Sequence, residues 1–191
     1  RKIFGELVAF DKIWRTGANL NTLVSFSDAV KVNGKELKAG IYSFFTIPSK
    51  GEWKVIFNTV KDGWGEGKYD EKYDAIRLDV VPKSIEKQES MEFSFDRLTE
   101  TSGIMTLAWE FLAIDLKIEV NVDEKAWENI EKAIDEATEK NKASVYRNSA
   151  KYTASSKKRL EDGLKWIEES IEIKEYWYSY WVKADVQYAM K

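Results

Sequence analysis

The residues best suited to bind a ligand lie in one short segment near the start of the sequence. Trp14, Arg15 and Asn19 fall within the six residues WRTGAN. A tryptophan ring can stack on a sugar, an arginine can bind a carboxylate through two parallel hydrogen bonds, and an amide can both donate and accept. The segment therefore predicts a site for a small polar or carbohydrate ligand. In the alternative, structural interpretation, Trp14 fills the protein core and Arg15 pairs internally, with Glu110 as a candidate partner.

A fourth candidate, Trp64, lies in the glycine-rich stretch KDGWGEGKYD, residues 61–70. An aromatic side chain flanked by glycines on a loop can stack on a sugar or cover a pocket. The stretch lacks the Lys-Ser or Lys-Thr pair of a phosphate-binding loop. Its acidic residues do not have the spacing of a calcium-binding EF-hand loop; they are Asp62, Glu66 and Asp70, with Asp74 nearby. We therefore expect a mobile hairpin tip that carries Trp64, and no metal site.

The sequence of 191 residues contains no histidine and no cysteine. This excludes thiolate nucleophiles, disulfides, zinc sites built from Cys or His, and an imidazole general base. We therefore predict a non-catalytic binding or scaffold protein without a cofactor. A glycoside hydrolase that uses two carboxylates is the competing hypothesis, with Glu6, Asp11 and Glu110 near aromatic positions. A purely structural interaction module is the third.

Charge and hydropathy argue against two classes of partner. The 30 basic and 33 acidic residues give a net charge of -3, and they form no basic stripe of the kind that a phosphate backbone requires. The longest apolar stretches, such as residues 41–47, are much shorter than the roughly 20 residues that cross a bilayer. We expect neither nucleic-acid binding nor a membrane span.

Alternation of apolar and polar residues with a period of two dominates residues 21–120, and it is typical of antiparallel strands with one buried face. Asn33-Gly34 predicts a tight hairpin turn, because both residues tolerate a positive φ. Residues 105–110 and 112–120 alternate in opposite phase, which we interpret as the two strands of a second hairpin. The pattern predicts a mainly β fold, with a jelly-roll-like antiparallel β-sandwich of eight or nine strands over residues 1–120.

Residues 121–191 have a helical period instead. We predict helices over residues 123–141 and 143–153, a third around Leu160–Ile171, and a fourth around Trp177–Tyr188. Tyr146 and Ala150 return 34 residues later as Tyr180 and Ala184, and this spacing is that of a tetratricopeptide repeat. The sequence thus predicts a tetratricopeptide-like helical extension, through which the protein could contact a partner.

The last helix is unusually rich in aromatic residues. Five positions fall on one helical stripe, which we expect to be buried in the helical core; they are Trp177, Tyr180, Trp181, Ala184 and Tyr188. Tyr176 and Tyr178 do not fit this stripe and should point elsewhere.

Three stretches, RKIFGELVAFDKIWRTGAN, VKVNGKELKAGIYSFFTIPSKGEWKVIFN and MEFSFDRLTETSGIMTLAWE, occur in this order within residues 1–120. They resemble a bacterial family of unknown function whose hallmark is the WRTGAN segment. The resemblance implies an exported protein, in the periplasm or at the outer surface, and no established activity. Members usually have a further strand-forming stretch before RKIFG, so the resemblance also implies a trimmed chain with an exposed sheet edge.

Overall fold

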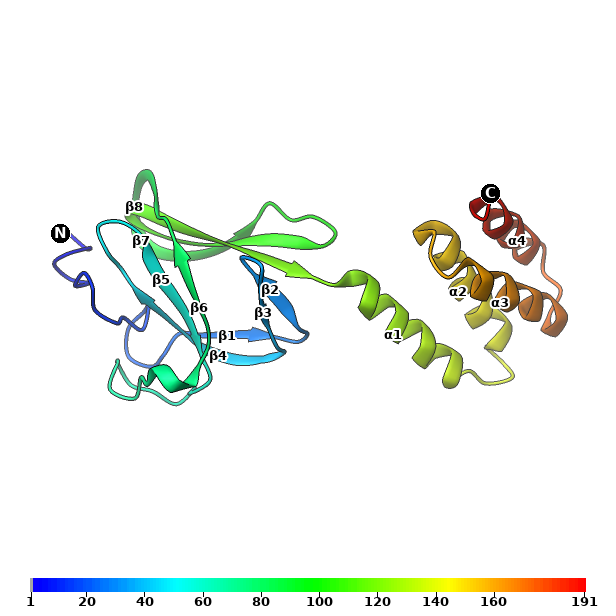
Figure 1. Cartoon of the computed structure of the whole chain (residues 1–191), viewed down its shortest axis with the longest axis horizontal. Coiled ribbons are helices and arrows are strands. Elements are labelled where there is room, and N and C mark those ends of the chain that lie inside the picture. Colours follow the sequence, from blue (N-terminus) through cyan, green and yellow to red (C-terminus); the bar gives the residue numbers. More distant parts are fainter. Residues whose placement is uncertain (1) are drawn as a thin grey trace. The chain divides into compact units, whose positions relative to one another are not determined.

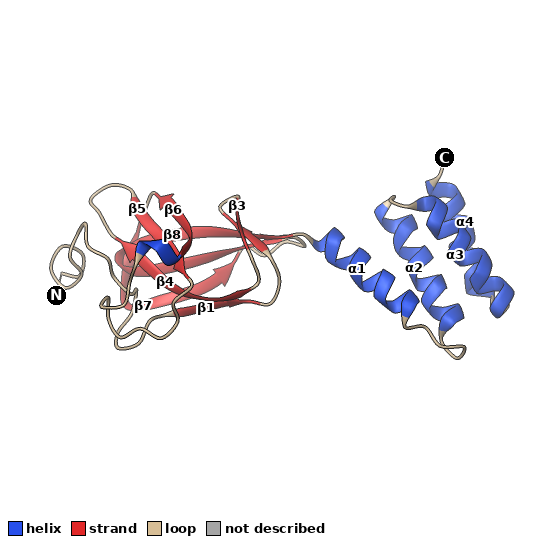
Figure 2. Cartoon of the chain, turned by 60° about the horizontal axis from the view of Figure 1, so that its bottom comes forward, coloured by secondary structure: helices blue, strands red, loops and turns tan. Residues whose placement is uncertain are grey.

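The computed structural model describes residues 2–191, which form two compact units that divide after Val122 (Figure 1). The first unit contains β-strands and the second contains α-helices (Figure 2). The predicted fold class, mainly β with a C-terminal helical extension, is therefore confirmed.

The β unit is built from two four-stranded antiparallel sheets within the described residues. One sheet has the order β1-β4-β5-β6, from strands β1 (Leu23–Phe26), β4 (Gly40–Ile47), β5 (Trp53–Asn58) and β6 (Asp74–Val80). The other has the order β3-β2-β8-β7, from strands β3 (Lys35–Leu37), β2 (Val30–Val32), β8 (Ser102–Val120) and β7 (Lys83–Asp96). A short 3-10 helix, η1 (Glu71–Tyr73), precedes β6.

Large aromatic side chains fill the space between the two sheets. Phe44 of β4 is fully buried, with ring centroids 5.3 Å from Phe57 of β5 and 5.6 Å from Phe93 of β7. Both contacts have the edge-to-face geometry that aromatic pairs prefer. Burial of each such ring contributes about 2–3 kcal/mol to folding, so this cluster joins the two sheets into one core.

The hairpin predicted from Asn33-Gly34 is confirmed. The two residues connect β2 to β3 and have φ angles of 46° and 79°, and Val32 pairs with Lys35 across the turn. Positive φ at both central positions gives the turn a twist that matches that of the flanking strands.

The second predicted hairpin is wrong, because residues 102–120 form one continuous strand, β8. Glu110 has a φ of 56° in the middle of this strand, and the pairing with β7 shifts register on both sides of it. An irregularity of this kind reverses the phase of the alternation without ending the strand. Leu107 is therefore buried before the irregularity and Ile114 after it.

Four helices follow, at the predicted places: α1 (Val122–Asp135), α2 (Lys142–Ser156), α3 (Leu160–Ile173) and α4 (Trp177–Ala189). α1 ends six residues earlier than predicted. The side chain of Asn141 accepts hydrogen bonds from the backbone N–H of Thr138, at 2.7 Å, and from its hydroxyl, at 3.0 Å. These bonds stabilise a turn between α1 and α2, where an asparagine competes with helical hydrogen bonding.

Small residues allow α2 and α3 to approach closely. A Cβ atom added to Gly163 of α3 would lie 1.9 Å from Oγ1 of Thr153 on α2. The hydroxyl of Ser170 on α3 donates to the carbonyl of Ala143 at 2.6 Å. The fully buried apolar residues of this unit form a small cluster, which consists of Ala150, Ile167, Val182 and Val186.

The buried stripe predicted for the last helix is wrong. All five of its residues, Trp177, Tyr180, Trp181, Ala184 and Tyr188, are exposed. α4 instead buries Ser179, Val182 and Val186, which lie on its opposite side. Bulky aromatic side chains would keep α4 away from α2 and α3, whereas serine and valine allow close packing.

Candidate functional site

Trp14 is part of the core and does not line a surface site. Its backbone pairs with Thr46 of β4 in both directions, at 2.8 and 2.9 Å, and its side chain is 9% exposed. The indole ring stacks on Trp109 of β8 at 6.0 Å and donates to the carbonyl of Gly17. Trp14 thus fixes the start of the WRTGAN segment to the sheet, as in the structural interpretation.

Arg15 lies at the surface and pairs with Glu66, so the candidate partner Glu110 was wrong. Nη1 of Arg15 lies 3.1 Å from Oε1 of Glu66, and the arginine side chain is 22% exposed. Its Nε atom is buried and makes no hydrogen bond within the described residues. Glu110 instead accepts a hydrogen bond from the backbone N–H of Ile3 at 3.3 Å.

Two loops, residues 15–21 and 61–67, are joined by backbone hydrogen bonds. Gly65 N–H donates to the carbonyl of Asn19, and Asn21 N–H donates to the carbonyl of Gly63, both at 3.1 Å. Leu20 and Trp64 are consequently directly opposite each other in an antiparallel bridge. The bridge brings Arg15, Asn19 and Trp64 together, although they lie on separate segments of the sequence.

An unusual backbone conformation at Asn19 and the absence of a side chain at Gly63 make this bridge possible. Asn19 has a φ of 67°, which asparagine tolerates better than most residues. Gly63 packs against Asn21 so closely that an added Cβ atom would lie 2.3 Å from the Asn21 side chain. The glycine-rich composition of the second loop therefore serves its contact with the first.

Trp64 and Leu20 form the apolar part of the site. Their exposed fractions are 68% and 65%, and paired residues of an antiparallel bridge project to the same side. Leu20 did not emerge from the sequence analysis, because a single apolar residue in a polar loop gives no pattern. Only its pairing with Trp64 identifies it.

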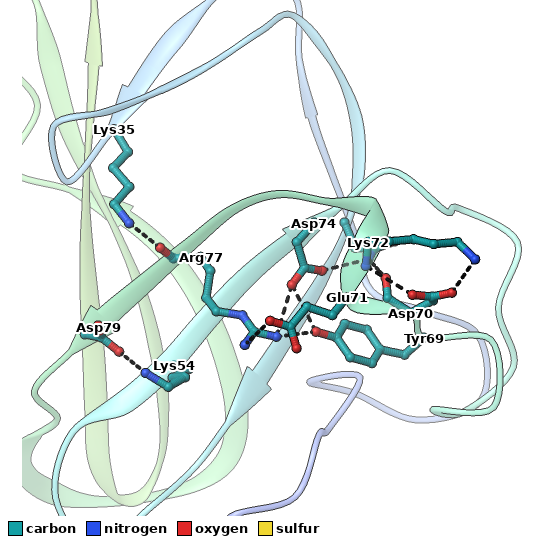
Figure 3. A network of polar contacts seen from close by, with 10 residues as sticks. Lys35, Lys54, Tyr69, Asp70, Glu71, Lys72, Asp74, Arg77 and Asp79 are labelled. Carbon is teal, nitrogen blue, oxygen red and sulfur yellow. Dashed lines mark hydrogen bonds and ion pairs between the residues drawn. The ribbon is translucent and has the colours of Figure 1, made fainter.

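A polar network secures the C-terminal half of the loop that carries Trp64 (Figure 3). The Tyr69 hydroxyl donates to Asp74 at 3.0 Å and accepts from Arg77 at 2.6 Å, and Asn58 donates to Asp74 at 2.8 Å. Burial, with a further contribution from the hydrogen bond to Asp74, raises the pKa of Tyr69 to about 12. Tyr69 therefore keeps its proton at neutral pH, and the network remains intact.

The four carboxylates in and beside the glycine-rich stretch each bind a different cationic side chain. Glu66 pairs with Arg15, Asp62 with Lys68, Asp70 with Lys72, and Asp74 with Arg77. The hydrogen bonds from Lys68 and Lys72 also lower the pKa values of Asp62 and Asp70. These carboxylates stabilise the loop through ion pairs, and they do not converge on one point.

The ion pair between Arg15 and Glu66 sets the charge of the candidate site. Because the two charges compensate each other, the site has no excess positive charge to attract a free anion. It offers donors from the guanidinium and an acceptor from the carboxylate, and the exposed side chains of Trp64 and Leu20 lie on the same two loops. Neutral polyhydroxylated molecules have both polar and apolar faces, so their chemistry matches this arrangement.

A separate groove of about 390 Å³ lies between β1 and the turn that connects β7 to β8. Its lining is mostly apolar and includes Val24, Phe26, Phe95, Leu98 and Ile118. None of the four predicted ligand-binding residues contributes to it.

Comparison with known proteins agrees with the two-unit organisation. Residues 1–120 match the family model described as "Protein of unknown function (DUF2911)". The chain belongs to this family. No curated protein and no solved structure matches the chain.

The DUF2911 match ends at Val120, the last residue of β8, so it covers all eight strands and both loops of the candidate site. None of the helices in the described part of the chain has the length and apolar character needed to span a bilayer.

The carboxylates considered for glycoside hydrolysis have separate environments in the DUF2911 domain. Glu6 and Asp11 are exposed on the segment before β1, and Glu110 is half-buried within β8. Glu110 accepts a hydrogen bond from the backbone of Ile3, which joins the segment before β1 to β8. Asp11 has a φ of 58° within that segment. Both observations fit structural roles.

Proposed function

We propose that the protein is a non-catalytic binding module whose β unit binds a small polar or carbohydrate ligand at Arg15, Asn19 and Trp64. The observation that carries this proposal is the exposed indole of Trp64, on a loop whose next two residues, Gly65 and Glu66, bond to Asn19 and Arg15. An exposed tryptophan on a fixed backbone loses little conformational entropy on binding. Trp14 contributes indirectly, because its packing fixes the segment that carries Arg15.

A saccharide is the ligand class that best fits these side chains. Sugar hydroxyls donate and accept hydrogen bonds, while the C–H faces of the ring pack on indole. The Arg15–Glu66 pair offers both a donor and an acceptor, as such a ligand requires, and Glu66 is two residues from Trp64 in the chain.

To test this proposal, the 191-residue chain is titrated with chitotetraose, cellotetraose and a muropeptide. Calorimetry and saturation-transfer NMR measure the binding of each probe. We expect one of these probes to bind, and Trp64→Ala to weaken its affinity about tenfold or more. Trp177→Ala is the matched control, because Trp177 is equally exposed but belongs to the helical unit. No binding by any probe, or equal binding by Trp64→Ala and the unmodified chain, would contradict the proposal.

We further propose that the helical unit contacts another protein. The supporting observation is the large exposed aromatic surface of α4, since apolar patches of this kind on soluble proteins are typical of interaction sites. This role makes the protein a scaffold that couples ligand binding in one unit to protein contact in the other.

We also propose that the protein acts in the periplasm or at the outer surface of a bacterial cell. Support comes from the resemblance of the WRTGAN region to exported proteins. Fractionation of cells that express the full-length protein tests this location, and recovery in the cytoplasm alone would contradict it.

A further inference from the structure

α4 has two apolar faces, of which one is covered within the helical unit. Ser179, Val182 and Val186 form the covered face. The other, which we name the α4 aromatic face, consists of Trp177, Tyr180, Trp181, Ala184 and Tyr188. At about 100° per residue, these five positions lie within an arc of about 100°. Trp177 is 69% exposed and Tyr188 is 80% exposed, although large aromatic side chains are mostly buried in folded proteins.

The internal repeat relates the α4 aromatic face to a face of α2. Tyr180 and Ala184 follow Tyr146 and Ala150 by 34 residues. The same offset relates the other three positions of the face, Trp177, Trp181 and Tyr188, to Ala143, Arg147 and Ala154. All five positions of the α4 aromatic face therefore have a counterpart on α2.

In α2, the counterpart face is covered. Tyr146 and Ala150 are buried, and the carbonyl of Ala143 accepts the hydrogen bond from Ser170 of α3. The guanidinium of Arg147 lies 5.0 Å from the centre of the Tyr176 ring, at the start of α4. Both α3 and α4 pack against α2. In the first copy of the repeat, α3 and the start of α4 therefore cover this face.

The chemistry of α3 defines what such a covering helix needs. Gly163 and Ser170 lie seven residues apart on the side that contacts α2, and the buried Ile167 lies between them. Small residues permit close approach, and the central isoleucine supplies apolar contact. Short connections make consecutive helices antiparallel, so α3 runs opposite to α2.

We propose that the α4 aromatic face binds an amphipathic helix of the α3 kind, antiparallel to α4 and supplied by a partner protein. This inference rests on the proposed role of the helical unit in protein contact. A partner helix with small residues fits better than a second copy of this chain. A second copy would place the bulky Trp177, Trp181 and Tyr188 against the same bulky residues, and its α3 is already packed in its own core.

The test titrates the 191-residue chain into a fluorescein-labelled peptide with the sequence of residues 158–174, which contains α3, and follows fluorescence anisotropy. We expect one peptide to bind per chain. Ala184→Glu should weaken binding at least tenfold, because it puts a charge at the centre of the α4 aromatic face. A peptide with Gly163→Leu should also bind at least tenfold more weakly. Ala133→Glu, at an exposed position of α1, is the matched control and should bind normally.

Sedimentation velocity on the same samples distinguishes the ways in which the inference could fail. Peptide binding that survives Ala184→Glu would overturn it. Self-association that Ala184→Glu abolishes would also overturn it, but would leave the role of the helices in protein contact standing. Absence of both peptide binding and self-association would overturn that role as well, while the saccharide titration of the β unit remains an independent result.

Discussion

The two units place their aromatic residues in opposite ways. In the β unit, Phe44, Trp53 and Phe57 are almost fully buried, whereas in the helical unit Trp177, Trp181 and Tyr188 are exposed. Stacked sheets lie about 10 Å apart, and large rings are needed to fill that space. Helices that approach as closely as α2 and α3 leave room only for small side chains, such as Gly163 and Ser170.

The two units therefore differ in how completely they bury their aromatic side chains. The β unit has a large core between its sheets, although Trp64, Phe95 and Phe111 are exposed. The fully buried apolar cluster of the helical unit contains four residues, while the aromatic side chains of Trp177, Trp181 and Tyr188 are exposed. Binding to a partner helix would therefore bury surface that the helical unit leaves exposed.

The strongest destabilisation is predicted for a substitution in the core of the β unit. Phe44→Ala should destabilise it by about 3–5 kcal/mol, because the substitution leaves a cavity between the sheets. Hydrogen exchange followed by mass spectrometry should show lost protection in β4, β5 and β7 and unchanged protection in α2–α4. An equal loss of protection in the helices would contradict this prediction, because it would show that the two units unfold together.

An intermediate effect is expected at the contact between α2 and α3. Gly163→Ala should destabilise the helical unit by about 1–3 kcal/mol through overpacking against Thr153, although alanine favours a helix by about 1 kcal/mol. Circular dichroism at 222 nm during urea unfolding measures the change. In a Thr153→Ala background, the same substitution should cost less; an unchanged cost would show that the close approach of the two helices is not the cause.

The smallest effect concerns an ion pair on the second sheet. Burial alone would raise the pKa of Asp115, but hydrogen bonds from Lys83, Arg97 and Thr106 outweigh it and hold the pKa below 3.8. A lowered pKa in the folded state stabilises the protein above pH 3.8, and this stabilisation is lost as the pH falls further.

Asp115→Asn should therefore cost about 1 kcal/mol at pH 7. It should also flatten the loss of stability below pH 4, because the substituted side chain no longer titrates. Thermal unfolding of both proteins between pH 2 and pH 7 measures the two slopes. The same dependence of stability on pH in both proteins would contradict a contribution of Asp115. Loss of the helical signal alone at low pH would show that the helical unit, and not the β unit, is destabilised by acid.

Local sequence patterns were enough to predict the class of fold and most of its elements. Period-two alternation located the strands, Asn33-Gly34 located one hairpin, and the change to a helical period located the four helices. These features depend on residues close together in the chain, so local rules suffice. The absence of His and Cys likewise limits the chemistry of the side chains, whatever fold the chain adopts.

Local patterns could not predict which loops contact each other or which helix faces are covered, because both depend on residues far apart in the chain. The alternation of apolar and polar residues changes phase at Glu110, and such a change is compatible with a turn or with an irregular strand. The pairing of β8 with β7 on both sides of Glu110 shows that it is an irregular strand. No local sequence pattern predicts that Leu20 pairs with Trp64 or that Arg15 pairs with Glu66. The aromatic stripe of α4 was predicted to be buried because it is apolar, but burial depends on what packs against a helix. Close packing selected the opposite face, with Ser179, Val182 and Val186.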